Sequence, residues 1–575
     1  MAITDCELHS KTLGPLPIIN SVLGRLRLLE FLEKRVPHDD QRRKLAPAVA
    51  LGVLLRNILV AREPLYGLSE WAVRFDEQSL GLPPGGVGHL NDDRVGRCLD
   101  LLFQANRGAL LTDIMVHAVR TFNVDLSELH NDSTTVSLSG QYPHADGRPY
   151  KGRPTLRITF GHNKDHRADL KQLLWIMTTA GDSAVPVWCC AEHGNTSDDK
   201  THVNTWSTLC RLVGGADFLY VADSKLCTMD NMQHIAKNNG RFVTVLPKTR
   251  REDTWFRDWL QTHDPKWVEL LRRKNSRRKS GPDEVFRGFE SPLPSVEGFR
   301  IAWIWSSQKF EKDRIIRESS IERAVEELEH LRARIGSPKS QLTTRQKIES
   351  AATEILTRCN AKRWIAASVS ATETHRFTQA RPGRPGANTK FVRKTKMTFQ
   401  LNWGAIDEAL QYDSRLDGLF PLIFNDKELT PRDALLAYKR QPFLEKRHEQ
   451  MKTVFEVMPV NLKTPRRIEA LLFVYFLVLL VESLIERETR LAMKAAAMES
   501  IPLYPESRPN KAPTANRIFE VFSDVRRHQL LGPNGEVHKC FYDKLTNLQS
   551  TLLHLLGLTP GSYFSGGEEA RVGNR

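Results

Sequence analysis

The 575-residue chain has no C-x-x-C pair among its eight cysteines and no apolar run of bilayer length. The scattered cysteines exclude the common zinc-ligand and dithiol redox spacings and are typical of a reduced, cytosolic chain. The most apolar run, residues 470–481, falls short of the roughly 20 residues of a membrane helix and predicts a buried core helix. The first residues lack a secretory pattern. We therefore expect a cytoplasmic protein with no membrane partner.

Acidic residues are also fewer than basic ones: the chain has 68 Asp and Glu residues against 83 Lys and Arg residues, which gives a net charge of +15. Such an excess favours a polyanionic partner. The hydrophobic fraction of 40% and the charged fraction of 26% are those of a folded globular chain. A chain of this length folds as several domains. A multi-domain protein that binds nucleic acid is the interpretation that fits these figures.

Changes of sequence pattern divide the chain into five segments of an α/β protein. Helical periodicity dominates first, and short β-rich runs separated by polar turns begin after residue 123. The predicted segments are an N-terminal helical domain (1–123), the first part of a core (124–248), an insertion containing the basic run 272–280 (249–400), the second part of the core (401–485), and a linker with a helical C-terminal tail (486–575). The first segment could bind DNA ends or support dimerisation.

Two aspartates follow apolar runs that are predicted to be strands. Asp132 lies in HNDSTTV at the end of the first run, and Asp223 ends another in FLYVADSK. Strand ends of an α/β sheet face the crevice where ligands bind, and carboxylate oxygens suit Mg²⁺. Taken singly, an Asp followed by Ser is more often a turn or a helix cap.

A third acidic residue belongs to a spaced array. Tyr438, Gln441, Glu445 and Lys452 follow one another at intervals of three, four and seven residues, which fit one helical face. Pro442 disfavours helical geometry at Gln441, so Tyr438 is expected to end one helix while Glu445 and Lys452 share the next. A Glu and a Lys two turns apart are otherwise a common exposed pair.

Together, Asp132, Asp223 and this array resemble the DDE transposases of bacterial insertion sequences whose signature is Tyr-x2-Arg-x3-Glu-x6-Lys. The signature arginine falls on Gln441 here, beside Arg440. Four further segments, in this order, are similar to that group: GHNKDHRADLKQ (161–172), EHGNTSD (192–198), VADSKLCTMDN (221–231) and DGLFPLIFNDKELT (417–430). The resemblance covers most of residues 13–485.

The resemblance implies a ribonuclease-H-like catalytic core interrupted by an insertion domain. It also implies that Asp132, Asp223 and Glu445 hold two Mg²⁺ or Mn²⁺ ions per active site, a geometry that aligns and stabilises phosphodiester displacement. The expected reaction is nicking at the terminal inverted repeats of an element, followed by joining of 3′-hydroxyl ends to target DNA within a homodimer. Such a protein works in the cytoplasm on the nucleoid.

Further residues are candidates for contacts with double-stranded DNA. Lys452 suits phosphate, with a structural ion pair as the alternative, and Tyr438 suits the substrate strand. The remaining candidates are Arg440, Gln441, Lys164, Arg167 and Arg384. Arg384, in RPGRPG, could enter a minor groove or belong to an ordinary Pro/Gly connector. Two other functions stay open, a metal-dependent nuclease without strand transfer and a non-catalytic DNA-binding protein derived from a transposase.

Overall fold

The computed structural model describes residues 6–37, 44–275, 281–337, 340–454 and 462–565. Residues 276–280 of the predicted basic run lie outside the described residues. The chain forms two compact units, one of residues 1–244 with 436–575 and the other of residues 245–435. We call them the core unit and the inserted unit, and each is described by itself.

A mixed sheet of strands β4-β3-β2-β5-β6 crosses the core unit. The strands are β2 (Glu128–Leu138), β3 (Lys171–Ala180), β4 (Pro186–Glu192), β5 (Leu219–Ala222) and β6 (Arg241–Val245). The first three pair antiparallel, and β5 and β6 run parallel to β2. Helices α7 (His202–Val213) and α8 (Met229–Lys237) make the crossovers that parallel strands require. The mixed α/β architecture predicted from sequence is confirmed.

A long buried helix, α15 (Pro465–Ala495), passes through the core unit. It packs against helices from the predicted N-terminal helical segment and against β4. These N-terminal helices are α1 (Leu16–Arg25), α2 (Leu28–Arg35), α3 (Pro47–Val60), α4 (Leu68–Val73), α5 (Asp92–Gln104) and α6 (Arg107–Phe122). Among the described residues, α15 alone is long and apolar enough to cross a membrane, and its most apolar stretch is entirely buried. The predicted buried helix at 470–481 is confirmed, within a longer helix.

The C-terminal region contains strands as well as the helices that were expected. Strands β15 (Arg526–Leu531) and β16 (Val537–Tyr542) form a hairpin, and β1 (Glu7–Thr12) adds to β15. The Asn534-Gly535 turn residues favour a hairpin, a signal that the prediction of a helical tail overlooked. The helices of this region are α16 (Ala515–Phe522), α17 (Asn547–Leu555) and α18 (Pro560–Phe564).

The inserted unit contains four antiparallel strands in the order β12-β9-β8-β7. They are β7 (Val268–Arg273), β8 (Glu284–Glu290), β9 (Arg300–Ser306) and β12 (Leu419–Phe424). Helix α9 (Arg251–Thr262) packs on them through Phe256, whose ring stacks on Trp303 with centroids 3.6 Å apart. The unit extends past the boundary predicted at residue 400, because β12 pairs with β9.

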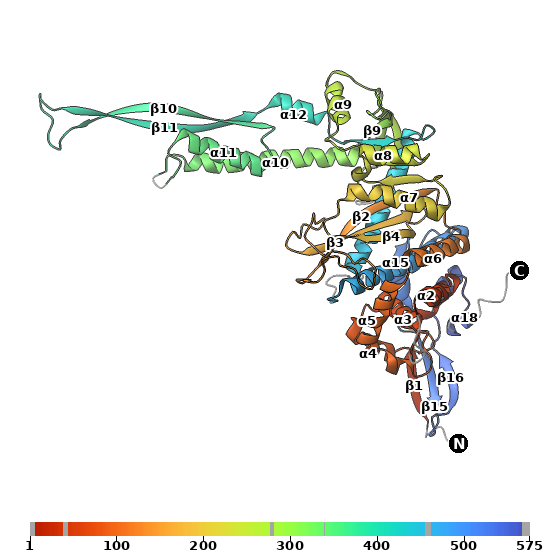
Figure 1. The fold of residues 1–575 in the computed structure, drawn as a ribbon. Coiled ribbons are helices and arrows are strands. Elements are labelled where there is room, and N and C mark those ends of the chain that lie inside the picture. The colour runs from red at the N-terminus through yellow and green to blue at the C-terminus, as the bar shows by residue number, and fades with distance from the viewer. Residues whose placement is uncertain (1–5, 38–43, 276–280, 338–339, 455–461, 566–575) are drawn as a thin grey trace. The chain divides into compact units, whose positions relative to one another are not determined.

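A separate two-stranded ribbon leaves this unit. It consists of β10 (Ile365–Gln379) and β11 (Phe391–Ala405), which pair only with each other along their whole length (Figure 1). Helices α10 (Ser307–Arg334) and α11 (Arg345–Arg358) pack on the base of the ribbon around a local apolar core. From β11 the chain passes through α12 (Asp407–Ser414) to β12 and on to α13 (Pro431–Tyr438).

Candidate active site

Strand register brings the two predicted aspartates side by side. The parallel pairing of β2 with β5 runs as far as Asn131 opposite Ala222, so the next residues, Asp132 and Asp223, stand level. Strand β5 stops there, whereas β2 continues to Leu138 along β3. Asp132 therefore lies inside its strand, not at the predicted strand end, and it faces the point where the neighbouring strand has ended.

Asp223 is held in this position from two sides. Its side chain accepts a hydrogen bond from the Lys225 amide at 3.0 Å and caps the short helix η5 (Ser224–Leu226). The Thr244 hydroxyl donates to its carbonyl oxygen at 2.6 Å. Asp223 is thus a helix cap, as the simpler interpretation expected, and at the same time a neighbour of Asp132.

Glu445 reaches the same cluster from the helix α14 (Gln441–Glu449). The predicted break before Pro442 is confirmed, because α13 ends at Tyr438 and a new helix starts at Gln441. Lys452, however, lies in the π-helical turn η6 (Gln450–Val454) and does not share α14 as predicted. Burial, followed by the charges of Asp223, Glu445 and Asp132, raises the pKa of Tyr438 to about 12. The tyrosine and the three carboxylates therefore form one electrostatic cluster.

The three carboxylates are not equivalent. Burial opposes the charge on Asp132, but His448 and Lys164 outweigh it and lower the pKa of this carboxyl. Burial and the charge on Asp132 raise the pKa of both Asp223 and Glu445. Each ionised carboxylate thus makes the next harder to ionise, so the cluster favours an additional cation.

Lys164 already supplies one positive charge. Its ammonium lies 3.6 Å from Asp132 and 3.0 Å from Asp198, and it donates to the carbonyl and hydroxyl of Ser133 at 2.6 and 2.9 Å. Burial alone would lower its pKa, but Asp132 and Asp198 raise it. Sequence reasoning treated Lys164 only as a DNA contact and missed Asp198, although both lie in segments that carried the family resemblance.

His448 is a second residue that sequence reasoning missed. It lies three residues after Glu445 on α14, is buried, and places Nδ1 3.6 Å from Asp132 Oδ2. Its Nε2 has no hydrogen-bond partner within the described part of the chain. The i, i+3 spacing from the predicted glutamate was the available signal.

Arg440 and Gln441, both predicted DNA contacts, fasten the start of α14 to β2. Arg440 pairs with Glu128. The buried Gln441 places its amide oxygen 2.9 Å from His130 Nδ1 and donates its amide N–H to the Asn131 carbonyl at 3.0 Å. The buried amide of Gln441 thus bridges the side chain of His130 and the backbone of β2.

Burial opposes the charge on Glu128, yet its bonds to His130 and Arg440 lower the pKa of this carboxyl to about 2. The ion pair with Arg440 therefore persists at neutral pH.

Restoring the signature arginine is expected to harm the protein. The substitution Gln441→Arg puts a longer, charged side chain in place of a buried amide, and loss of a buried hydrogen bond costs about 1 to 3 kcal/mol. Urea unfolding at pH 7 measures the change. Phe443→Arg, on the exposed side of the same helix, is the control and should fall within about 0.5 kcal/mol of wild type. Equal stability of Gln441→Arg and wild type would contradict the clamp.

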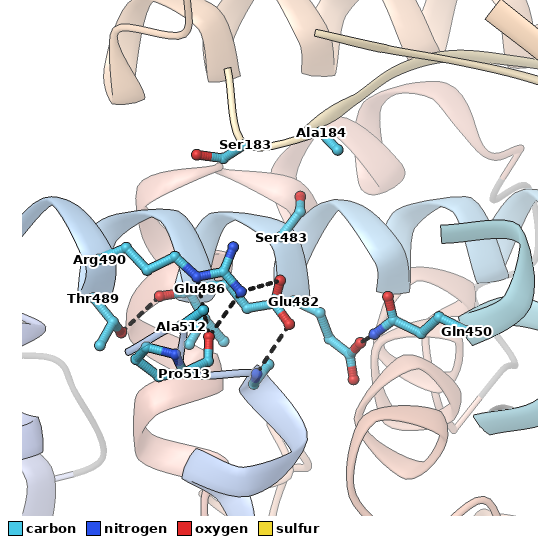
Figure 2. Close-up of polar contacts among 12 residues, drawn as sticks. Ser183, Ala184, Gln450, Glu482, Ser483, Glu486, Thr489, Arg490, Ala512 and Pro513 are labelled. Atoms are coloured by element: carbon cyan, nitrogen blue, oxygen red, sulfur yellow. Dashed lines mark hydrogen bonds and ion pairs between the residues drawn. The ribbon is translucent and has the colours of Figure 1, made fainter. Parts of the chain in front are cut away.

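The far end of α14 is fastened to α15. The buried Arg447 donates to the carbonyls of Ser183 and Ala184 in the β3–β4 turn at 3.4 and 3.2 Å, and to Glu486 at 2.8 Å. Figure 2 shows Glu482 and Glu486 on α15, with Gln450 reaching Glu482 and Arg490 beside Glu486. Both ends of the helix that carries Glu445 are thus tied to buried partners.

Glu482 makes this anchor sensitive to pH. Burial, followed by the charge of Glu486, raises the pKa of the Glu482 carboxyl to about 8. The folded state holds this proton more tightly than the unfolded chain, so the stabilisation is complete below about pH 4.5 and is lost as pH rises towards 8.

Glu482→Gln should therefore remove a decline of about 3 to 5 kcal/mol in unfolding free energy between pH 4.5 and 8. The amide keeps the shape and can still meet Gln450. Denaturant unfolding at several pH values tests this, with the exposed Glu449→Gln as the matched control. Parallel pH profiles for wild type and Glu482→Gln would rule the effect out.

The remaining predicted DNA contacts lie outside the carboxylate cluster. Lys452 pairs with Asp165 at 2.7 and 2.8 Å, the ion pair that stood as its alternative role. Arg167 is exposed and pairs with Asp169. Arg384 is exposed at the tip of the ribbon in the inserted unit. Their contacts with DNA stay predictions.

The carboxylate oxygens of the cluster are the ligand type that a hard divalent cation prefers. Their negative charges repel one another, and the Lys164 ammonium beside Asp132 compensates only one of them. No three His, Cys, Asp or Glu side chains among the described residues lie close enough to close a metal site. Asp132, Asp223 and Glu445 supply carboxylate oxygens of the kind that bind such an ion, but in this structure their side chains are not close enough together to bind one ion jointly.

Comparisons with known proteins give few matches. A family profile described as a domain of unknown function (DUF4277) matches residues 8–116. No curated protein matches the sequence. A piggyBac transposase, solved in a synaptic complex with hairpin DNA, is 10% identical and aligns over 96% of this chain and 86% of that chain with a TM-score of 0.38. A TM-score of this size does not establish a shared fold.

Proposed function

We propose that this protein is a DDE transposase that nicks DNA at the ends of an insertion sequence and joins the 3′-hydroxyl ends to target DNA. One observation carries the proposal: the register of β2 and β5 sets Asp132 beside Asp223, and a fastened helix adds Glu445 to them. Three carboxylates from separate chain segments, gathered where β5 ends, suit phosphodiester chemistry. The ribonuclease-H-like identity of the core is part of the proposal.

Under this proposal Asp132, Asp223 and Glu445 would hold Mg²⁺ or Mn²⁺, which supplies charge stabilisation for in-line displacement at phosphorus. The chain's own residues do the rest. Tyr438 stays protonated and can donate its hydroxyl hydrogen to a phosphate oxygen. Lys164 offsets part of the negative charge that would repel a DNA strand, and His448 orients the Asp132 carboxylate.

The proposal extends to partners and place. It expects double-stranded DNA with terminal inverted repeats, a target duplex, a homodimer on paired ends, and a cytoplasmic site of action on the nucleoid. The excess of basic residues supports a DNA partner.

Glu445→Gln should abolish metal-dependent cleavage of a labelled element-end duplex while leaving its affinity for DNA unchanged, because a neutral amide holds a divalent cation much more weakly than a carboxylate does. Glu449→Gln, one turn further along α14 and exposed, is the control and should cleave like wild type. Denaturing gels with Mg²⁺ or EDTA give the cleavage result, and a gel shift gives the binding result.

The same reactions separate the competing functions. Cleavage without joined products would identify a nuclease, and binding without cleavage by wild type would identify a non-catalytic DNA-binding protein. Equal cleavage by Glu445→Gln and wild type would remove Glu445 from the active site.

Lys164→Met should lower the melting temperature by about 1 to 2 °C in EDTA, as expected for a loss of roughly 1 kcal/mol in a unit of this size, because the carboxylates then repel without compensation. Added Mn²⁺ should raise the melting temperature of this variant more than that of wild type. Arg167→Met, in the same segment but paired with the exposed Asp169, is the control. Equal Mn²⁺ shifts in all three proteins would show that the ammonium and the ion do not compete.

A further inference from the structure

The β10–β11 ribbon has two chemically distinct faces. Cross-strand partners share a face, so the register places Thr372 with Thr398, Thr374 with Lys396, and Arg376 with Lys394 on one side. We call this the polar face. From its first pair, Ala366 and Gly404, to its last, Thr378 and Val392, it contains no Asp or Glu.

The opposite face is buried near the base of the ribbon and exposed towards its tip. Near the base, Val369 and Leu401 are buried in the core formed with α10 and α11. Towards the tip the same face carries the exposed side chains of Met397, Phe377 and Phe391. Among the described residues, α10 and α11 therefore cover one face at the base only, and no other strand pairs with the ribbon (Figure 1).

The basic side chains of the polar face are available for binding. Arg376, Lys394 and Lys396 are exposed, and within the described residues none of them has an acidic partner. Some exposed arginines elsewhere in the inserted unit are paired, since Arg314 pairs with Glu311 and Arg345 pairs with Glu349. Charge on the polar face of the ribbon is thus left uncompensated at these three positions.

We propose that the polar face of the β10–β11 ribbon is a DNA-binding surface that lies in the major groove and contacts phosphates through Arg376, Lys394 and Lys396. A two-stranded ribbon fits the width of that groove, and exposed Thr, Asn and Gln side chains are suited to phosphate oxygens and base edges. The face spans about 40 Å along each strand, more than one turn of DNA at about 34 Å.

DNA explains this face better than a protein partner does. A protein interface would be expected to cover the exposed apolar side chains, and apart from Val392 those of the ribbon lie on the opposite face. An acid-free row of hydroxyls, amides and cations is the composition of a surface that meets a polyanion. The proposal goes beyond the carboxylate cluster and does not require that cluster to be catalytic.

The test measures binding of full-length protein to a labelled 30-base-pair duplex of arbitrary sequence by fluorescence anisotropy at several salt concentrations. The triple variant Arg376→Ala, Lys394→Ala, Lys396→Ala should bind at least about tenfold more weakly, with a salt slope shallower by about 2 to 3, as expected for three lost phosphate contacts. The matched control removes three paired charges of the same sign, Arg272, Arg314 and Arg345, and should bind within about twofold of wild type.

A second variant, Phe377→Ser, Phe391→Ser, Met397→Ser, changes the opposite face. Wild-type affinity and salt slope in the polar-face variant would overturn the proposal. A loss of self-association in the apolar-face variant, with DNA binding unchanged in both variants, would overturn it in favour of a protein interface. Because the readout is binding, its failure is separate from the failure of Glu445→Gln to block cleavage.

Discussion

Repulsion among neighbouring carboxylates is the constraint on which the candidate site depends. Asp132 and Asp223 stand level because parallel strands share a register, and the low dielectric of their surroundings strengthens their repulsion. Such an arrangement persists only if something compensates it. Lys164 and His448 do so in part, and both are aimed at Asp132, the carboxyl whose pKa is lowered. The remaining imbalance is what a divalent cation would relieve.

Holding Glu445 close to these aspartates needs a rigid support, because its segment is remote in sequence from both strands. The clamp at Gln441 ties one end of α14 to β2, and the bonds of Arg447 tie the other to α15 and to the β3–β4 turn. Helix α15 is buried along most of its length, so it moves little relative to the sheet. Glu482 and Glu486 are buried acidic residues of α15. They are therefore part of the support of the site, although neither belongs to the carboxylate cluster.

Hydrophobic periodicity and helix-breaking residues predicted much of this structure. Alternating strand and helix patterns gave the mixed α/β core, Pro442 marked the helix break, and an apolar run of limited length indicated a buried helix. The features that the sequence did not predict depend on contacts between segments that are distant along the chain. Nothing local shows that Gln441 meets His130, that Lys164 lies between Asp132 and Asp198, or that β1 joins a C-terminal hairpin. The signature pattern made Gln441 a candidate DNA contact, whereas its buried amide contacts His130 and the Asn131 carbonyl.

The carboxylate cluster of the core unit and the basic ribbon of the inserted unit have complementary chemical roles under the two proposals. A bare carboxylate cluster repels phosphate, and one ammonium offsets only part of this repulsion, so under the proposed function the affinity for DNA must come from cations outside the cluster. Screening limits such attraction to about 8 Å at physiological salt, which requires the cations to contact the duplex directly. Paired arginines cannot meet this need, because a neighbouring glutamate already takes up their charge. The uncompensated cations of the polar face can, which is why a surplus of 15 positive charges matters less than where three of them are left without a partner in the described structure.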